Sequence, residues 1–205
     1  MPDCKNKGLM IVVSGPAGSG KGTVLGHLMK DGNYRYSVSA TTRQPRPGEV
    51  NGVNYHFLTR EAFIDRIARD EMLEYTEYCG NYYGTPRKEA EEVLESGCNL
   101  ILEIEVKGAA NVKRKYPEAV TIMLLPPSGK VLEARLRGRG TESEEVIQER
   151  MAQARNEIAQ IKHYDYVVYN YDNMAEDAAR IIREIVHAEQ YATVRQPDIA
   201  DTYFA

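Results

Sequence analysis

The distribution of apolar residues along the chain predicts strands and helices that alternate. Five short apolar runs, rich in β-branched residues, mostly lack the alternation of a half-exposed strand, as expected for strands covered on both faces. These runs are LMIVV (9–13), YSVSA (36–40), NLILEI (99–104), AVTIMLL (119–125) and DYVVYN (165–170). Amphipathic helical stretches lie at 22–30, 89–97, 108–116, 144–162 and 174–191. This alternation predicts βαβ units and a mostly parallel sheet of the α/β class.

Residues 41–88 break this alternation. They are rich in Pro, Gly and Tyr, with one helix-like stretch near 60–70, two short strand-like runs, YHFL and MLEYTEY, and a predicted aromatic turn at Tyr82–Thr85. The many aromatic residues favour a folded subdomain over a solvated linker. We therefore expect a core formed by residues 1–38 and 89–205 and an inserted subdomain at 39–88.

Composition and charge narrow the class of protein. With 42% hydrophobic and 27% charged residues, the 205-residue chain resembles an ordinary globular protein. A net charge of −4 argues against a dedicated nucleic-acid binder, since such proteins are usually basic. The three cysteines, Cys4, Cys79 and Cys98, fit no zinc pattern and predict free thiols.

The two ends of the chain carry less information. The apolar run at 9–13 is too short for a signal peptide or a membrane span, so we expect a cytoplasmic protein with no membrane partner. The last stretch, 192–205, has no clear period. A disordered tail and an oligomer arm both remain open there, as do a monomer and a homodimer.

A phosphate-binding loop is predicted directly after the first strand. The segment GPAGSGKGT matches the spacing GxxxxGK and precedes a helix, whose N-terminus favours anions. Lys21 can reach terminal phosphates, whereas Gly22 stands where a Ser or Thr usually contacts Mg²⁺, and Thr23 follows. The candidate ATP-side residues are Gly15, Pro16, Ala17, Gly18, Ser19, Gly20, Lys21, Gly22 and Thr23.

Two further segments carry candidate chemistry. Arg43 and Arg46 lie three residues apart in a proline-stiffened loop, and two guanidinium groups suit a phosphate dianion. Glu103 and Glu105 alternate at the end of a predicted buried strand, where ligands of α/β sheets gather. The segment RLRGRGTESEE (135–145) is basic but lacks the interleaved aromatics of a nucleic-acid site.

Together these segments resemble the guanylate kinase family, close to the bacterial enzymes. The matching pieces are GPAGSGKGT, SATTRQPRPGEVNG, EYCGNYYGT, LEIEVKG and RLRGRGTES, in the family's order from residue 9 to about 170. The resemblance implies a P-loop NTPase core, a GMP-binding insert at 39–88 and a lid at about 129–146. It implies that Arg43, Arg46, Tyr55 and Tyr83 hold the GMP phosphate and that Ser39, Glu74, Thr85 and Glu105 surround the guanine.

The same resemblance implies the remaining roles. Arg135 and Arg139 would close over ATP, Arg150 would reach the transferring phosphate, and Asn170 would lie on the adenine side. The catalytic set would be Lys21, Arg43, Arg135, Arg139 and Arg150. The family usually has Asp at one or both of the positions of Glu103 and Glu105, and Gln at the position of Lys107.

The expected reaction is transfer of the γ-phosphate of MgATP to GMP, giving ADP and GDP. Mg²⁺ would be the cofactor, on the side of Glu103 and through water, and ATP and GMP would be the small-molecule partners. Two alternatives remain open: a P-loop kinase for another phosphorylated acceptor, and a non-catalytic guanylate-kinase-like interaction module.

Overall fold

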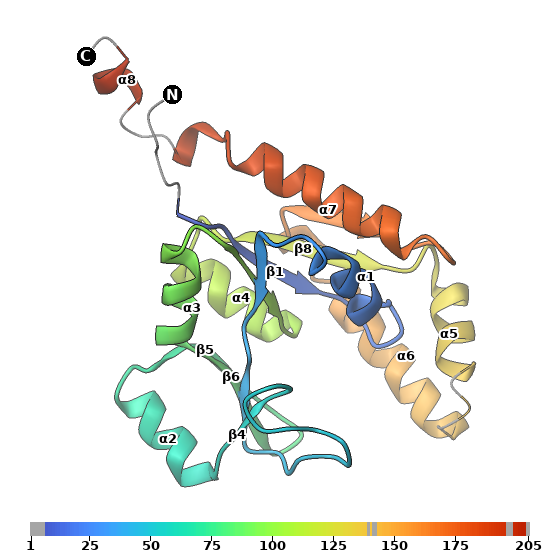
Figure 1. Cartoon of the computed structure of the whole chain (residues 1–205). Coiled ribbons are helices and arrows are strands. Elements are labelled where there is room, and N and C mark those ends of the chain that lie inside the picture. Colours follow the sequence, from blue (N-terminus) through green and yellow to red (C-terminus); the bar gives the residue numbers. More distant parts are fainter. Residues whose placement is uncertain (1–6, 139, 141–142, 196–198, 204–205) are drawn as a thin grey trace.

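A five-stranded parallel sheet forms the centre of the molecule (Figure 1). The computed structural model describes residues 7–138, 140, 143–195 and 199–203. The strand order is β2-β7-β1-β8-β9, and all neighbouring strands are parallel. The strands are β1 (Met10–Ser14), β2 (Tyr34–Tyr36), β7 (Asn99–Glu103), β8 (Val120–Leu125) and β9 (Tyr166–Tyr169). The predicted α/β class with a five-stranded parallel sheet is confirmed.

Helices cover both faces of this sheet, which explains why its strands are apolar at successive positions. The four covering helices are α1 (Lys21–Leu28), α3 (Arg87–Glu95), α4 (Val106–Lys115) and α7 (Ala175–Glu189). Ile11 and Val13 of β1 belong to the core cluster under α1 and α7, whereas Met10 and Val12 belong to the cluster under α3 and α4. Each face of the strand is thus packed against helices (Figure 1).

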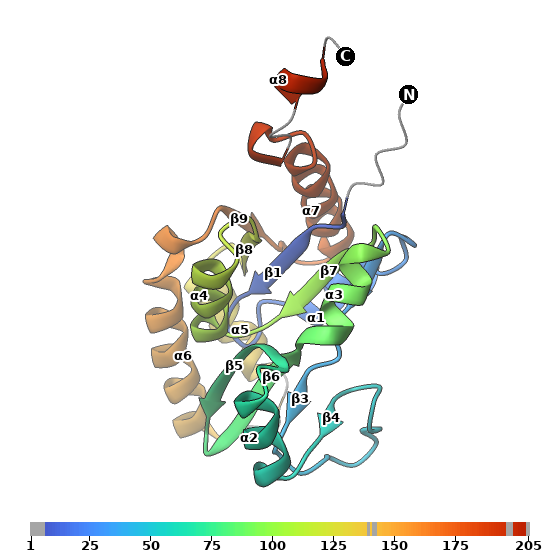
Figure 2. The same cartoon turned by 90° about the vertical axis from the view of Figure 1, so that its left-hand side faces the viewer.

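The segment between β2 and β7 in the sequence forms a second, smaller sheet (Figure 2). Its order is β4-β3-β6-β5, and it also carries one helix. The elements are β3 (Ala40–Thr41), β4 (His56–Phe57), α2 (Arg60–Ala68), β5 (Met72–Tyr78) and β6 (Asn81–Pro86). The fully buried ring of Phe63 on α2 stacks on Tyr82 of β6, with 5.3 Å between the ring centroids.

Two local predictions were wrong. The run at 36–40 is not one strand, because the chain leaves the central sheet after Tyr36 and joins the second sheet at Ala40. The segment Tyr82–Thr85 is not a turn but part of β6, which pairs antiparallel with β5. The turn lies at Cys79 and Gly80, whose φ values of 47° and 73° suit a two-residue hairpin.

Two helices lie in or begin within the predicted lid region, about 129–146. They are α5 (Gly129–Arg137) and α6 (Glu144–Ile158), and a 3₁₀ turn, η1 (Ile161–His163), follows. The side chains of Ser128 and Ser143 cap the two α-helices by accepting from backbone N–H groups. Arg137 at the end of α5 forms ion pairs with Glu133 and Glu144, so one guanidinium joins the two helices.

After α7 the chain forms two short helical turns, η2 (Thr193–Arg195) and α8 (Ile199–Thr202). Arg195 donates to the backbone carbonyl of Glu118 at 2.7 Å and pairs with Glu189 at 3.1 Å, which ties η2 to the core. Within the described parts of the chain, no helix is both long enough and apolar enough to cross a membrane.

Candidate active site

The predicted phosphate-binding loop lies between β1 and α1. Gly20, whose φ is +85°, ends the loop, and a Cβ built there would lie 2.3 Å from Nδ2 of Asn170. Lys21 begins α1, and its Nζ donates to the backbone carbonyls of Gly15 and Pro16. The fold therefore places glycine where no side chain fits and a cation at the mouth of the loop.

This loop borders a large cavity of about 680 Å³. Of the predicted ATP-side residues, Gly15, Pro16, Ala17 and Lys21 line it. Gly18, Ser19, Gly20, Gly22 and Thr23 do not, and Gly22 and Thr23 are exposed in the first turn of α1. The opposite wall is one face of α6, formed by Arg150, Gln153, Ala154 and Glu157.

A second cavity, of about 250 Å³, adjoins the first in the smaller sheet. All of the predicted acceptor-side residues except Thr85 line it, namely Ser39, Arg43, Arg46, Tyr55, Glu74, Tyr83 and Glu105. The two cavities share part of their lining, including Ser39, Arg46, Tyr55, Glu103 and Glu105. The structure thus brings residues from far apart in the sequence to the junction of two adjoining cavities.

Glu74 is the most unusual side chain of the smaller cavity. It is a carboxyl group that is only 6% exposed, and Thr85 Oγ1 donates to its Oε1 at 2.9 Å. Burial raises the pKa of Glu74 from its ordinary 4.5 to about 7, although the hydrogen bonds from Thr85 oppose the rise. Thr85 therefore orients Glu74 without lining the cavity itself, and Oε2 remains toward the first turn of α4 near Gly108.

Cations and phenols gather at the other end of the smaller cavity. The guanidinium of Arg43 lies 5.5 Å from the ring centroid of Tyr55, and the rings of Tyr55 and Tyr83 meet edge to face at 6.3 Å. Glu49 binds Nη2 of Arg43 with both oxygens, at 2.9 and 3.0 Å, and accepts the backbone N–H of Arg46. The bond to Glu49 raises the pKa of Arg43, so this guanidinium stays charged and fixed.

Sequence reasoning missed Glu49 as a site residue. It lies six residues after Arg43 and lines the smaller cavity. The signal was present, since an acid in a short loop with two arginines is a natural ion-pair partner.

Glu103 and Glu105 lie at the end of β7, as predicted, and both line both cavities. Burial raises the pKa of Glu103 and of Glu105. The positive charge of the Lys21 ammonium opposes this rise for both carboxyls. The α6 side chain of Glu157 also raises the pKa of Glu105 by like charge. Two acids therefore face the mouth of the phosphate-binding loop.

The protein groups beside Lys21 suit a cation whose ligands are mainly water and phosphate oxygens. No group of three or more His, Cys, Asp or Glu residues with metal-site geometry exists in the described ranges. Glu103 offers a carboxylate whose pKa, raised by burial, is partly lowered by the charge of Lys21, and the residue directly after Lys21 is Gly22, which has no hydroxyl. One carboxylate and open space suit Mg²⁺, which usually keeps several waters and binds phosphate oxygens.

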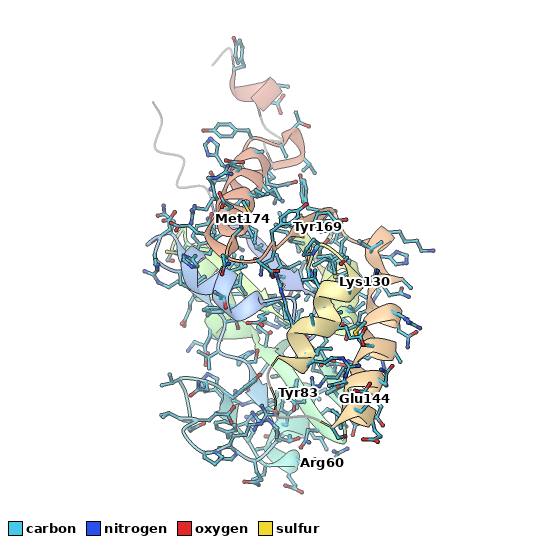
Figure 3. All side chains as sticks on the ribbon, turned by 90° about the vertical axis from the view of Figure 1, so that its right-hand side faces the viewer. Arg60, Tyr83, Lys130, Glu144, Tyr169 and Met174 are labelled. Atoms are coloured by element: carbon cyan, nitrogen blue, oxygen red, sulfur yellow. The ribbon has the colours of Figure 1, made fainter. Side chains whose placement is uncertain are left out.

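The predicted lid arginines take different positions. Arg150 on α6 lines the larger cavity, whereas Arg135 on α5 lines neither cavity. Arg135 binds Asp172 Oδ1 at 2.7 Å, the carbonyl of Asn170 at 2.9 Å and the carbonyl of Ser19 at 3.5 Å. Arg139 falls outside the described residues. In Figure 3, Lys130 and Glu144 mark the starts of α5 and α6, while Tyr83 and Arg60 mark the second sheet and its helix.

Asn170 supports the phosphate-binding loop from behind. Its side chain is buried, and its Nδ2 donates to the Ser19 carbonyl at 2.9 Å. Arg135 donates to the same carbonyl, so the residue after β9 and helix α5 both hold the loop. Asn170 lines neither of the two cavities described above.

The sequence analysis also missed several residues of the cavity walls. Tyr36 and Ser37 lie where the chain crosses between sheets, and Tyr78 ends β5. Gln153 and Glu157 follow Arg150 at helical spacing, so the periodicity of the predicted helix could have identified them. Tyr36 and Ser37 were not identified, because the sequence did not predict that the chain passes from the central sheet to the second sheet after Tyr36.

Comparisons with known proteins agree with this geometry. Over residues 7–189 the chain matches the family described as Guanylate kinase. It is 56% identical to a guanylate kinase of Halalkalibacterium halodurans over 186 residues, 90% of each chain. It is 53% identical to a guanylate kinase of Shouchella clausii over 186 residues, also 90% of each chain.

The fold comparison gives the same result. The chain is similar to the crystal structure of guanylate kinase from Anaplasma phagocytophilum, with a TM-score of 0.76 and 32% identity. The match covers 97% of this chain and 96% of that one. The resemblance in the sequence motifs is therefore confirmed over nearly the whole chain. This chain belongs to the guanylate kinase family, a family of kinases.

Proposed function

We propose that the protein transfers the γ-phosphate of ATP to GMP, giving ADP and GDP. One observation carries the proposal: the phosphate-binding loop with Lys21 and the buried carboxyl of Glu74 border two cavities that share a lining. A phosphate donor on the loop and a nucleotide acceptor beside Glu74 would then meet at the junction.

The transfer needs no covalent intermediate with the protein. An oxygen of the GMP phosphate attacks the γ-phosphorus in line, a new P–O bond forms, and the bond to the β-phosphate oxygen breaks. The acceptor phosphate is largely dianionic near neutral pH, because its second pKa is about 6, so no general base is required. Lys21 and Arg150, which line the larger cavity, would stabilise charge on the transferring group.

Glu74 would select guanine. The N1–H and the 2-amino group of guanine are adjacent donors, and one ionised carboxylate can accept both. Adenine has an acceptor at N1 and no 2-amino group, so it would offer the buried Glu74 no donor from the base at these positions. Sites of this kind reject such analogues by about 10⁴-fold or more. Thr85 would keep the carboxyl in place, and Ser39 and Glu105 would lie around the base.

Arg43, Arg46, Tyr55 and Tyr83 would bind the acceptor phosphate. Their guanidinium and phenol donors line the same cavity as Glu74. Glu49 would keep the Arg43 guanidinium in one orientation and so reduce the entropy lost on binding.

The metal side of the site would be Glu103, acting through water. When bound with ATP, Mg²⁺ supplies positive charge that neutralises the phosphate oxygens. Arg135 and Asn170 would act as positioning residues for the loop, because both bind the Ser19 carbonyl. Arg139 would complete the lid as the family resemblance implies.

The site of action proposed is the cytoplasm, where ATP and GMP are available. Cys79 is an exposed free thiol and Cys98 a half-buried one, which agrees with a reducing compartment. Monomer and homodimer both remain compatible with this function.

A direct assay tests the proposal. The purified full-length protein is incubated with ATP, Mg²⁺ and one nucleoside monophosphate at a time, and ADP formation is measured. We expect turnover with GMP and at most trace turnover with AMP, CMP or UMP. Equal ADP formation with AMP would remove the guanine assignment, and ADP formation without any acceptor would make the protein an ATPase.

A further inference from the structure

Tyr78 occupies an unusual position between the two parts of the site. It is the last residue of β5, beside the two-residue turn at Cys79 and Gly80, and it lines both cavities. Its hydroxyl donates to Oε1 of Gln153 on α6 at 3.3 Å. This bond joins the smaller sheet to α6, whose side chains form one wall of the larger cavity.

Gln153 is held from its other end as well. Its Nε2 donates to Oε1 of Glu157 at 2.8 Å, one helical turn further along α6. Arg150, Gln153 and Glu157 lie at i, i+3 and i+7 and line the same wall of the larger cavity. A hydrogen bond to the Gln153 amide therefore constrains the same face of α6 that carries Arg150.

Two acidic side chains face each other across the larger cavity near Gln153. Glu157 on α6 and Glu105 on the opposite wall are like charges, which repel the two sides of the cavity. The hydrogen bond from Tyr78 to Gln153 joins the smaller sheet to α6 and opposes that repulsion, while the bond from Gln153 to Glu157 lies within α6 and orients the Gln153 amide. The two-residue turn at Cys79 and Gly80 follows Tyr78 directly and so ends β5 beside this contact.

We infer that Tyr78 and Gln153 form a positioning relay that sets the place of Arg150 relative to the acceptor phosphate during transfer. This inference rests on the proposed function. The relay touches no reacting atom. Its effect on transfer arises when both substrates are bound, because the smaller sheet and α6 must then stand at a fixed separation.

The test compares Tyr78→Phe, Gln153→Leu and the double variant in the full-length protein. Each single variant is expected to lower kcat about fivefold, with KM for ATP and for GMP within about twofold of the wild type, because the relay affects the place of Arg150 during transfer more than the binding of either substrate. The double variant is expected to lose no more than about twofold beyond either single one, because both remove the same contact. Tyr75→Phe, on the same strand and exposed, serves as the matched control and keeps full activity.

A second measurement does not depend on turnover. Amide hydrogen exchange of the hairpin segment 77–82 is expected to rise in Gln153→Leu and to stay unchanged in Tyr75→Phe. Single variants with unchanged kcat, or losses that multiply in the double variant, would overturn the relay while leaving the proposed function intact. A wild-type protein without GMP-dependent transfer would overturn the proposed function, and unchanged hairpin exchange would then reject the relay separately.

Discussion

Replacing Glu74 by glutamine is expected to weaken GMP binding and, above neutral pH, to stabilise the protein without nucleotide. The wild-type carboxyl is 6% exposed, and its pKa is raised to about 7 by burial. Its ionised form is the one that accepts two donors from guanine. The same burial that provides selectivity therefore carries a cost in stability.

The sign of this cost follows from linkage. The folded state holds the Glu74 proton more tightly than the unfolded state, in which the pKa is near 4.5. The stability that this proton contributes is fully present below about pH 4.5 and is lost as the pH rises through about 7. At about 1.4 kcal/mol for each pH unit, the loss is about 3 kcal/mol. Glutamine stays neutral at every pH, so the Glu74→Gln variant does not lose this unfolding free energy as the pH rises.

Denaturant unfolding of both proteins between about pH 5 and 8.5 measures this difference. The unfolding free energy of Glu74→Gln minus that of the wild type should rise with pH and level off above about pH 8. Subtraction cancels the titration of all groups that the two proteins share, and the cost of burying the amide adds only a constant that does not change with pH. A difference that is flat across this range would refute the reasoning, because Glu74 would then be ionised at the same pH in both states.

Isothermal titration with GMP tests the functional half of the same prediction. Wild-type affinity should fall by up to about tenfold for each pH unit below the pKa of Glu74. The phosphate of GMP also titrates, near pH 6, but equally in both proteins, so the ratio of their affinities isolates the carboxyl. A ratio that does not change with pH would show that Glu74 does not bind the base.

Three further changes test the phosphate-binding loop. Lys21→Ala should abolish transfer and leave the unfolding midpoint nearly unchanged, because Lys21 is only partly buried; wild-type turnover would remove this cation from the mechanism. Asn170→Ala should raise KM for ATP several-fold and leave KM for GMP unchanged, since Nδ2 holds the Ser19 carbonyl; equal effects on both would indicate a general loss of fold. Gly20→Ala should destabilise by about 1–2 kcal/mol, since φ is +85° and the new Cβ meets Asn170; urea unfolding with an unchanged midpoint contradicts that geometry.

The central sheet was predictable because each buried strand is continuously apolar. In β1, four neighbouring residues pack against helices on alternating faces, and this pattern needs no tertiary information. The second sheet was less predictable. Its strands β3 and β4 are two residues each, too short for any periodicity, and depend on partners far along the chain.

The candidate site divides in the same way. The phosphate-binding loop follows from local spacing, and the roles around the acceptor followed from the family resemblance. The hydrogen bonds of Arg135 and Asn170 to Ser19 could not be predicted from the sequence, because Ser19 lies more than a hundred residues away from both. The missed contacts of Glu49, Tyr78 and Gln153 depend on how loops and helices meet in space, which no sequence window contains.

A single-turnover experiment with ATP labelled in its γ-phosphate tests the central claim most directly. The protein is mixed in excess over labelled ATP with Mg²⁺ and GMP, and the products are separated at successive times. The account predicts that the label passes straight to the β-phosphate of GDP, with no labelled protein at any time. Label that appears in inorganic phosphate, on the protein, or as readily in ADP when AMP replaces GMP would contradict it.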